Sequence, residues 1–216
     1  MEQRLADWPQ FARYAEENSK LPPPAKGEKR AIFYGDSITQ GWKLDQSFPD
    51  EGYLTRGISG QTTPQMLVRF RADVIKLRPK VVVILAGTND IAGNTGSMTL
   101  EQIEDNYATI AELARVHHIK AIFCSVTPVH NYTPRAQERL VRRPPEKILE
   151  LNRWLKENAD RYHYTYLDYF SALVDEHGLL RVEFAEDGLH PNADGYAVMA
   201  KVVAPVLAKS LGKRKR

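Results

Sequence analysis

The uninterrupted apolar run from Val81 to Leu85 (VVVIL) is the feature that most limits what this chain can fold into. Its length and its β-branched side chains suit a strand, and the lack of polar alternation indicates that both faces of the strand are covered. Such strands belong to parallel sheets that have helices packed on each side. The run therefore predicts an α/β protein.

Apolar segments of strand length alternate with helical patterns along the rest of the chain. Strands are predicted at 30–34, 53–56, 121–125 and 164–167, and helices at 8–19, 62–77, from Thr99 onward, from Pro144 or Pro145 to about 159, and at 192–210. This alternation predicts a parallel five-stranded sheet between two helical layers, a flavodoxin-like three-layer α/β/α sandwich.

Two helix starts carry local signals. Pro9 is predicted in the first turn of the helix over 8–19, whose apolar positions are Phe11, Tyr14 and Ala15. In the helix that begins at Thr99, Gln102 stands three residues later, and this spacing predicts a capping box.

Composition and charge suggest three parts. We predict an N-terminal helix with a Pro-rich connector (1–27) packed on the domain, a main domain (28–211) and a basic tail (212–216). The net charge of +3 depends on the last four residues, which carry four positive charges and leave −1 on the rest of the chain. That balance argues against a nucleic-acid partner.

Several classes of protein are excluded by simple features. A single cysteine, Cys124, cannot form an internal disulfide or a cysteine-cluster zinc site. The longest apolar stretch, Val81 to Ala86, is too short to span a bilayer, so we expect no integral membrane segment. Residues 1–20 lack the pattern of a secretion leader. Localisation stays open between the cytoplasm and a secreted or periplasmic site reached after removal of a leader, and so does the oligomeric state.

Polar clusters follow the predicted strands, where ligands bind in sheets of this type. They are 35–39 (GDSIT), 57–61 (GISGQ), 87–90 (GTND), 125–128 (SVTP) and, before the last helix, 187–191 (DGLHP). Together they contain a hydroxyl, amide donors, an imidazole and a carboxylate. Those groups are the parts of a serine acyl-transfer site.

Each group has an expected role in that chemistry. Ser37 is the candidate nucleophile, His190 its general base, and Asp187 the carboxylate that orients the imidazole. The backbone N–H groups of Ser37 and Gly60 and the side chain of Asn89 are candidate oxyanion donors. Taken singly, Ser37 could be a helix cap, and Gly60 and Asn89 could be turn residues. Their combination favours catalysis.

The polar clusters resemble the four sequence blocks of the SGNH hydrolases, also called GDSL-type esterases and lipases. The matching residues are Gly35-Asp36-Ser37, with Ile38 in place of the usual Leu, then Gly60, Gly87-Thr88-Asn89-Asp90, and Asp187-Gly188-Leu189-His190-Pro191. The resemblance covers about residues 28–211. Within the family, the chain looks most like bacterial members related to platelet-activating-factor acetylhydrolase subunits. It implies the flavodoxin-like sandwich and ester hydrolysis without a metal or another cofactor.

Substrate choice is less constrained by the sequence. Candidates for the substrate pocket are Asp36, Trp42, His130 and Tyr132. The segment 129–145 is long enough to form a lid. Its arginines, Arg135, Arg139, Arg142 and Arg143, could meet an anionic substrate, but a solvated and partly helical loop is the preferred interpretation.

We expect a small-molecule ester as substrate, with a short acyl group such as acetyl on a carbohydrate. One alternative is a lysophospholipase or thioesterase that acts on longer acyl chains. Another, from a different class, is a non-catalytic carbohydrate-binding module on the same fold.

Overall fold

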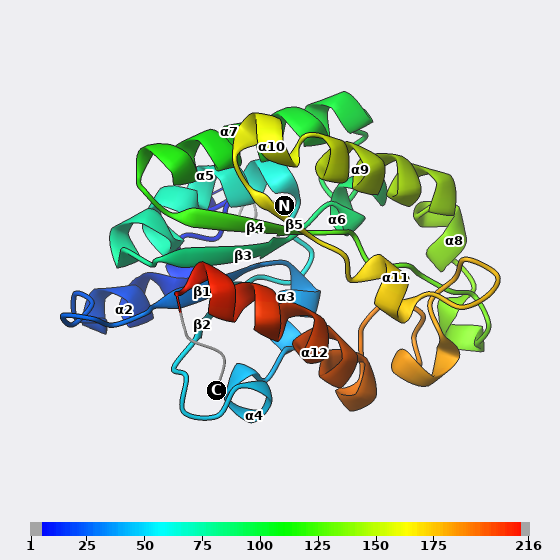
Figure 1. Cartoon of the computed structure of the whole chain (residues 1–216). Helices are drawn as coiled ribbons and strands as arrows, with labels where there is room; N and C mark the ends of the chain where they lie inside the picture. The colour runs from blue at the N-terminus through cyan, green and yellow to red at the C-terminus, as the bar shows by residue number, and fades with distance from the viewer. Residues whose placement is uncertain (1–5, 213–216) are drawn as a thin grey trace.

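The computed structural model describes residues 6–212 and contains one five-stranded sheet (Figure 1). All neighbouring strands are parallel, in the order β2-β1-β3-β4-β5. The strands are β1 (Ala31–Gly35), β2 (Leu54–Gly57), β3 (Val81–Leu85), β4 (Lys120–Cys124) and β5 (Thr165–Leu167). The predicted sheet is confirmed, and every strand lies within one residue of its predicted range.

Helices cover both faces of this sheet. They are α2 (Ala12–Lys20), α3 (Ser37–Gly41), α4 (Leu44–Ser47), α5 (Thr63–Asp73), α6 (Thr88–Ile91), α7 (Leu100–Val116), α8 (Arg139–Arg142), α9 (Pro145–Glu157), α10 (Ala159–Tyr162), α11 (Phe170–Leu173) and α12 (Ala193–Ser210). Helices α5, α7 and α9 lie on one side of the sheet and α12 on the other (Figure 1). The three-layer α/β/α sandwich is therefore confirmed. In the part of the chain that the structure describes, no helix is long and apolar enough to cross a membrane.

The central strand β3 shows why the sheet must be covered on both faces. None of its side chains is more than 5% exposed. Because successive side chains of a strand point to opposite faces, burial of all of them requires a packed layer on each side. The apolar run Val81–Leu85 therefore lies at the centre of the core.

Local capping signals set the starts of two long helices. Gln102 N donates to Thr99 Oγ1 over 3.2 Å, and Thr99 N donates to Gln102 Oε1 over 3.0 Å, so the predicted capping box is confirmed. Asn192 Oδ1 accepts from the N–H groups of Asp194 and Gly195, each at 3.0 Å, and caps α12. Both caps satisfy donors that would otherwise lack partners in the first helical turn.

The start of the first helix differs from the prediction. The helix begins at Ala12, not at residue 8, and Pro9 lies in the turn before it. The Asp7 carboxylate accepts from Phe11 N at 2.8 Å and Ala12 N at 3.0 Å, and this local cap ends the turn at that point. Phe11 was also misplaced by the prediction, because its side chain is 44% exposed.

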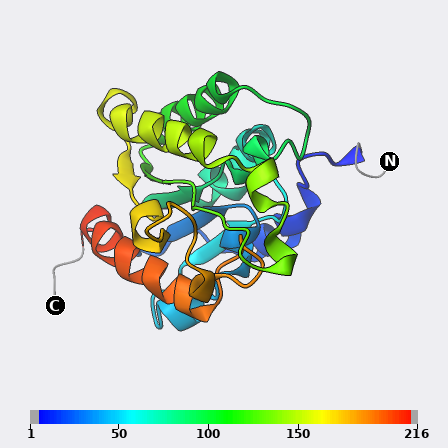
Figure 2. The same ribbon diagram turned by 90° about the vertical axis from the view of Figure 1, so that its right-hand side faces the viewer.

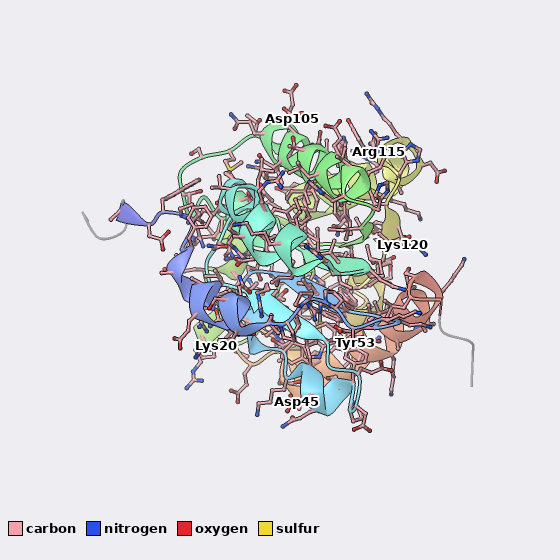
Figure 3. All side chains as sticks on the ribbon, turned by 90° about the vertical axis from the view of Figure 1, so that its left-hand side faces the viewer. Lys20, Asp45, Tyr53, Asp105, Arg115 and Lys120 are labelled. Carbon is pink, nitrogen blue, oxygen red and sulfur yellow. The ribbon has the colours of Figure 1, made fainter. Side chains whose placement is uncertain are left out.

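The segment before β1 packs on the rest of the molecule through α2. Tyr14 is buried and its hydroxyl donates to the Gly57 carbonyl at the end of β2. The buried Arg56 contacts α2 as well, donating to Asn18 Oδ1 at 2.9 Å and to Glu17 Oε1 at 2.8 Å. Figure 3 labels Lys20, where α2 ends, at the left of the view and Lys120, where β4 begins, at the right. The division at residues 27 and 211 stays a prediction, and positions 213–216 of the basic tail lie outside the described residues.

Candidate active site

Three of the predicted side chains meet at the carboxyl end of the sheet, the end that faces the viewer in Figure 2. Ser37 is the first residue of α3, directly after β1, and His190 lies in the loop before α12. Ser37 Oγ lies 2.9 Å from His190 Nε2, and His190 Nδ1 lies 2.7 Å from Asp187 Oδ2. In this arrangement the imidazole can take the hydroxyl proton while the carboxylate holds its other nitrogen.

The Asp187–His190 spacing builds a tight turn around one carboxylate. Asp187 Oδ1 accepts from Leu189 N at 3.0 Å and from His190 N at 2.8 Å, while Oδ2 faces the imidazole. Partial burial raises the pKa of Asp187, but these backbone and side-chain hydrogen bonds outweigh it and lower the pKa to about 2. The carboxylate is therefore ionised wherever the imidazole could act as a base.

The candidate oxyanion donors gather beside Ser37. Among the described residues, no hydrogen-bond acceptor faces the backbone N–H of Ser37 or of Gly60, whose φ of 77° suits glycine. Asn89 is 3% exposed, and its Nδ2 lies 3.1 Å from the Gln61 carbonyl and 3.3 Å from Asp36 Oδ2. Both N–H bonds of the Asn89 amide therefore already have acceptors. To bind Asn89, an oxyanion would have to displace the longer contact, the one to Asp36 Oδ2.

A residue that sequence reasoning missed joins two of these donors. Asn94 Nδ2 donates to the Gly60 carbonyl at 3.1 Å and to Asn89 Oδ1 at 3.0 Å. Since Asn89 Oδ1 is used as an acceptor, the amide nitrogen must point the other way, toward Asp36 and Gln61. Asn94 follows the GTND block by four residues, but nothing in that spacing pointed to this contact.

Helix α8 contributes a second group that the sequence did not reveal. Arg139 Nη2 donates to Asp187 Oδ2 at 2.9 Å, Arg142 Nη2 to Asn94 Oδ1 at 2.9 Å, and Arg143, directly after α8, donates from Nη2 to Asn89 Oδ1 at 3.3 Å. The interpretation of this stretch as a solvated and partly helical loop fits α8 and the exposed Arg142, but it is wrong for the buried Arg143. It holds for Arg135, whose side chain is 78% exposed. Spacing within one helical turn was the available signal, because residues three and four apart share a helix face.

Two of the predicted pocket residues are completely buried. Asp36 is 0% exposed and accepts from Ile38 N at 2.9 Å, so it caps α3. Burial raises the pKa of Asp36 to about 7 against the opposing effect of that hydrogen bond. His130 is also 0% exposed, with Nε2 at 2.6 Å from the Ala185 carbonyl and Nδ1 accepting from Tyr132 N. Neither side chain has surface to offer a ligand.

The other two pocket candidates, Trp42 and Tyr132, differ in their surroundings. Trp42 is 4% exposed, stacks on Tyr196 with ring centroids 5.4 Å apart, and lines a cavity of about 490 Å³ together with Pro191. Tyr132 is 44% exposed, and its hydroxyl donates to Asp175 Oδ2 at 2.7 Å. Trp42 is therefore the better placed of the two, because Pro191 follows His190 directly.

Known proteins share this sequence pattern and this fold. The sequence model of the GDSL-like Lipase/Acylhydrolase family matches residues 33–198. A GDSL-like lipase from Bacteroides thetaiotaomicron, 39% identical, superposes with a TM-score of 0.86 over 94% of this chain and 98% of that one. Esterase TesA of Pseudomonas aeruginosa is 33% identical over 122 residues, which are 54% of this chain and 59% of TesA.

More distant relatives match over most of this chain. An acetylxylan esterase of Xylanibacter ruminicola is 23% identical over 224 residues, covering 87% of this chain but 45% of that protein. Platelet-activating factor acetylhydrolase IB subunit alpha1 of Pongo abelii is 27% identical over 194 residues, 86% of this chain and 78% of the subunit. The chain spans about half the length of several curated relatives that it matches. With the family match extending over most of its length, the chain belongs to the GDSL-like lipase/acylhydrolase family of ester hydrolases.

Proposed function

We propose that Ser37, His190 and Asp187 are the catalytic triad of a serine esterase that removes short acyl groups through an acyl-enzyme intermediate. The observation that carries this proposal is the continuous chain of contacts from Ser37 Oγ to His190 Nε2, at 2.9 Å, and from His190 Nδ1 to Asp187 Oδ2, at 2.7 Å. A serine hydroxyl is a weak nucleophile until a base accepts its proton, and His190 is the one described residue whose side chain contacts the Ser37 hydroxyl.

Each step of the reaction then falls to a named group. Ser37 Oγ attacks the ester carbonyl and passes its proton to His190 Nε2. The N–H groups of Ser37 and Gly60 and the amide of Asn89 donate to the oxyanion. His190 gives the proton to the departing alcohol, and a water molecule, activated by the same imidazole, releases the acid and restores Ser37.

An ester with a polar alcohol part is favoured by the surroundings of the oxyanion donors. Asn94 Nδ2 donates to the Gly60 carbonyl and to Asn89 Oδ1, and Asn89 Nδ2 contacts the Gln61 carbonyl, so polar groups lie against both donors. One relative over most of this chain is named an acetylxylan esterase. Acetyl esters of carbohydrates fit both points, and a lysophospholipase or thioesterase activity on long acyl chains is the alternative.

Hydrolysis of p-nitrophenyl esters from acetate to dodecanoate tests both parts. We expect acetate or butyrate to be cleaved fastest, and Ser37→Ala to lose several orders of magnitude in kcat. Ser19→Ala, which removes an exposed hydroxyl on α2, is the matched control and should behave like wild type. Activity retained in Ser37→Ala would show that the triad assignment is wrong. A preference for dodecanoate would show that the enzyme acts on long acyl chains instead of short ones.

A further inference from the structure

A cavity of about 660 Å³ opens next to the candidate oxyanion donor Gly60. Its walls come from three segments: residues 7–10, the Ser59–Gly60 turn with Gln65 behind it, and the Asn94–Thr95 loop. Figure 2 shows the N-terminal segment (blue) beside the loop that follows α6 (green). Because Asn94 also bonds to Asn89, a molecule in this cavity lies against the oxyanion donors.

The side chains around the cavity select against two kinds of ligand. Among the described residues, no aliphatic side chain and no lysine or arginine lines it. An acyl chain would find no aliphatic wall, and a phosphate or carboxylate would find no cation, since Arg142, which donates to Asn94 Oδ1, does not line the cavity. The acidic side chain of Asp7 further disfavours an anion.

The same side chains suit a neutral ligand that carries several hydroxyl groups. Trp8 is 37% exposed and is the one aromatic residue of the described lining. No described residue forms a hydrogen bond with the Ser59 hydroxyl or the side-chain amide of Gln10, so both are free to bond to a ligand. An aromatic face with a few polar groups around it is the usual composition of a site that orients a small molecule.

The wall formed by residues 7–10 is held rigidly to the catalytic end of the sheet. Gln61, which follows Gly60 directly, donates from Nε2 to the Pro9 carbonyl at 2.8 Å. Gln65 Nε2 donates to the Trp8 carbonyl at 2.7 Å. Both glutamines are buried, and Gln10 has a φ of 60°, an uncommon value outside glycine. The segment is therefore anchored in one conformation beside Gly60.

We infer that this cavity is the subsite for a sugar ring on the alcohol side of the ester, with Trp8 beneath the ring and Gln10 and Ser59 bonding to its hydroxyls. The inference deepens the proposed function and rests on it. The acyl group would lie on the other side of the scissile bond, away from residues 7–10.

Comparison of a sugar ester with a sugar-free ester tests the subsite in active enzyme. The probes are a monoacetylated methyl xyloside and ethyl acetate, since the ring of a p-nitrophenyl ester could itself stack on Trp8. We expect the ratio of kcat/KM for the sugar ester to that for ethyl acetate to fall at least fivefold in Trp8→Ala and to recover partly in Trp8→Phe. Phe11→Ala, an exposed aromatic residue outside this cavity, should keep the wild-type ratio.

Direct binding separates failure of the subsite from failure of the proposed function. Methyl xyloside is titrated by calorimetry into Ser37→Ala protein with Trp8 and Gln10 intact and into the same protein carrying Trp8→Ala or Gln10→Ala. Saturable binding that Trp8→Ala or Gln10→Ala weakens at least fivefold supports the subsite even if no ester is cleaved. An unchanged ester ratio in Trp8→Ala, or binding that neither substitution alters, overturns it while leaving the esterase assignment intact.

Discussion

Arg139 donates two hydrogen bonds to Asp187, from Nε to the backbone carbonyl and from Nη2 to Oδ2, each over 2.9 Å. The same Oδ2 faces His190 Nδ1 at 2.7 Å. One carboxylate oxygen is thus shared by a guanidinium and an imidazole. The contact ties α8 to the loop that carries both Asp187 and His190.

Removal of the Arg139 guanidinium should reduce the rate by loosening this loop. In Arg139→Gln we expect kcat to fall about tenfold, within the range that small misplacements of a catalytic group produce. KM should change little, because Arg139 is assigned no contact with substrate. Steady-state kinetics on p-nitrophenyl acetate measure both values, and partial recovery in Arg139→Lys would show that the charge contributes. A wild-type kcat in Arg139→Gln would show that the contact between Arg139 and Asp187 does not position the catalytic loop.

Arg143 should matter for activity more than for stability. It is 3% exposed, its Nη1 has no hydrogen-bond partner in the described structure, and burial lowers its pKa to about 10. Replacing a buried, incompletely bonded cation by an apolar residue is often neutral or stabilising. In Arg143→Met we therefore expect an unchanged or higher Tm, with kcat about ten- to a hundredfold lower because Asn89 loses a contact that orients it.

Thermal denaturation and kinetics on the same preparation of Arg143→Met measure the effects on Tm and on kcat separately. Arg135→Met removes an exposed arginine of the same segment and serves as the control. A large drop in Tm alongside the loss of activity would mean that Arg143 is mainly structural.

Loss of the Asn89 side chain should slow the reaction by as much as loss of one oxyanion donor. Asn89→Ala is expected to lower kcat by roughly 10²–10³, the usual effect of losing such a donor. Asn94→Ala should lower kcat less, because the Asn89 amide is still present and loses only the contact that orients it. Both variants are compared on p-nitrophenyl acetate with folding checked by circular dichroism. Equal losses in the two would show that orientation of Asn89, rather than its donated hydrogen bond, limits the rate.

Burial of Asp36 should make stability depend on pH. Burial, and to a smaller extent the charge of Asp90, raise the pKa of Asp36 to about 7, although the Ile38 N–H and Arg143 oppose this. Between about pH 4, the ordinary value for aspartate, and pH 7, the folded state holds a proton that the unfolded state has released. The contribution of Asp36 to stability is therefore present at low pH and is lost as pH rises through 7.

Urea unfolding of wild type and Asp36→Asn measures this contribution. The free energy of unfolding of wild type relative to Asp36→Asn should fall as pH rises from 4 to 8. A constant difference across that range would show that Asp36 is ionised in the folded protein throughout.

Much of the site could be predicted because its signals are local. A carboxylate three residues before an imidazole forms one turn, and Ser37 directly follows a strand, so neither placement needs knowledge of distant contacts. Ser37 and His190 are 153 residues apart, yet their meeting was predictable as well. Parallel strands bring their carboxyl ends to one edge, and this topological rule replaces detailed knowledge of packing.

Other features required the packed structure. Asp36, on the same local evidence as Ser37, was expected in the pocket but is buried as a helix cap. The start of α2 depended on whether Asp7 or Pro9 controls the turn, a competition between two short-range effects of similar size.

The sequence by itself determined the sheet, its helical layers and the residues that supply the chemistry, because hydrophobic period, capping and strand-end motifs act over a few residues. Only the tertiary structure decided which side chains support that chemistry. Arg143 and Asn89 are 54 residues apart, and Arg139 and Asp187 are 48 apart. An arginine so far away in the sequence contacts a site residue or water depending on how α8 packs against the ends of the strands. No short-range sequence pattern predicts that packing.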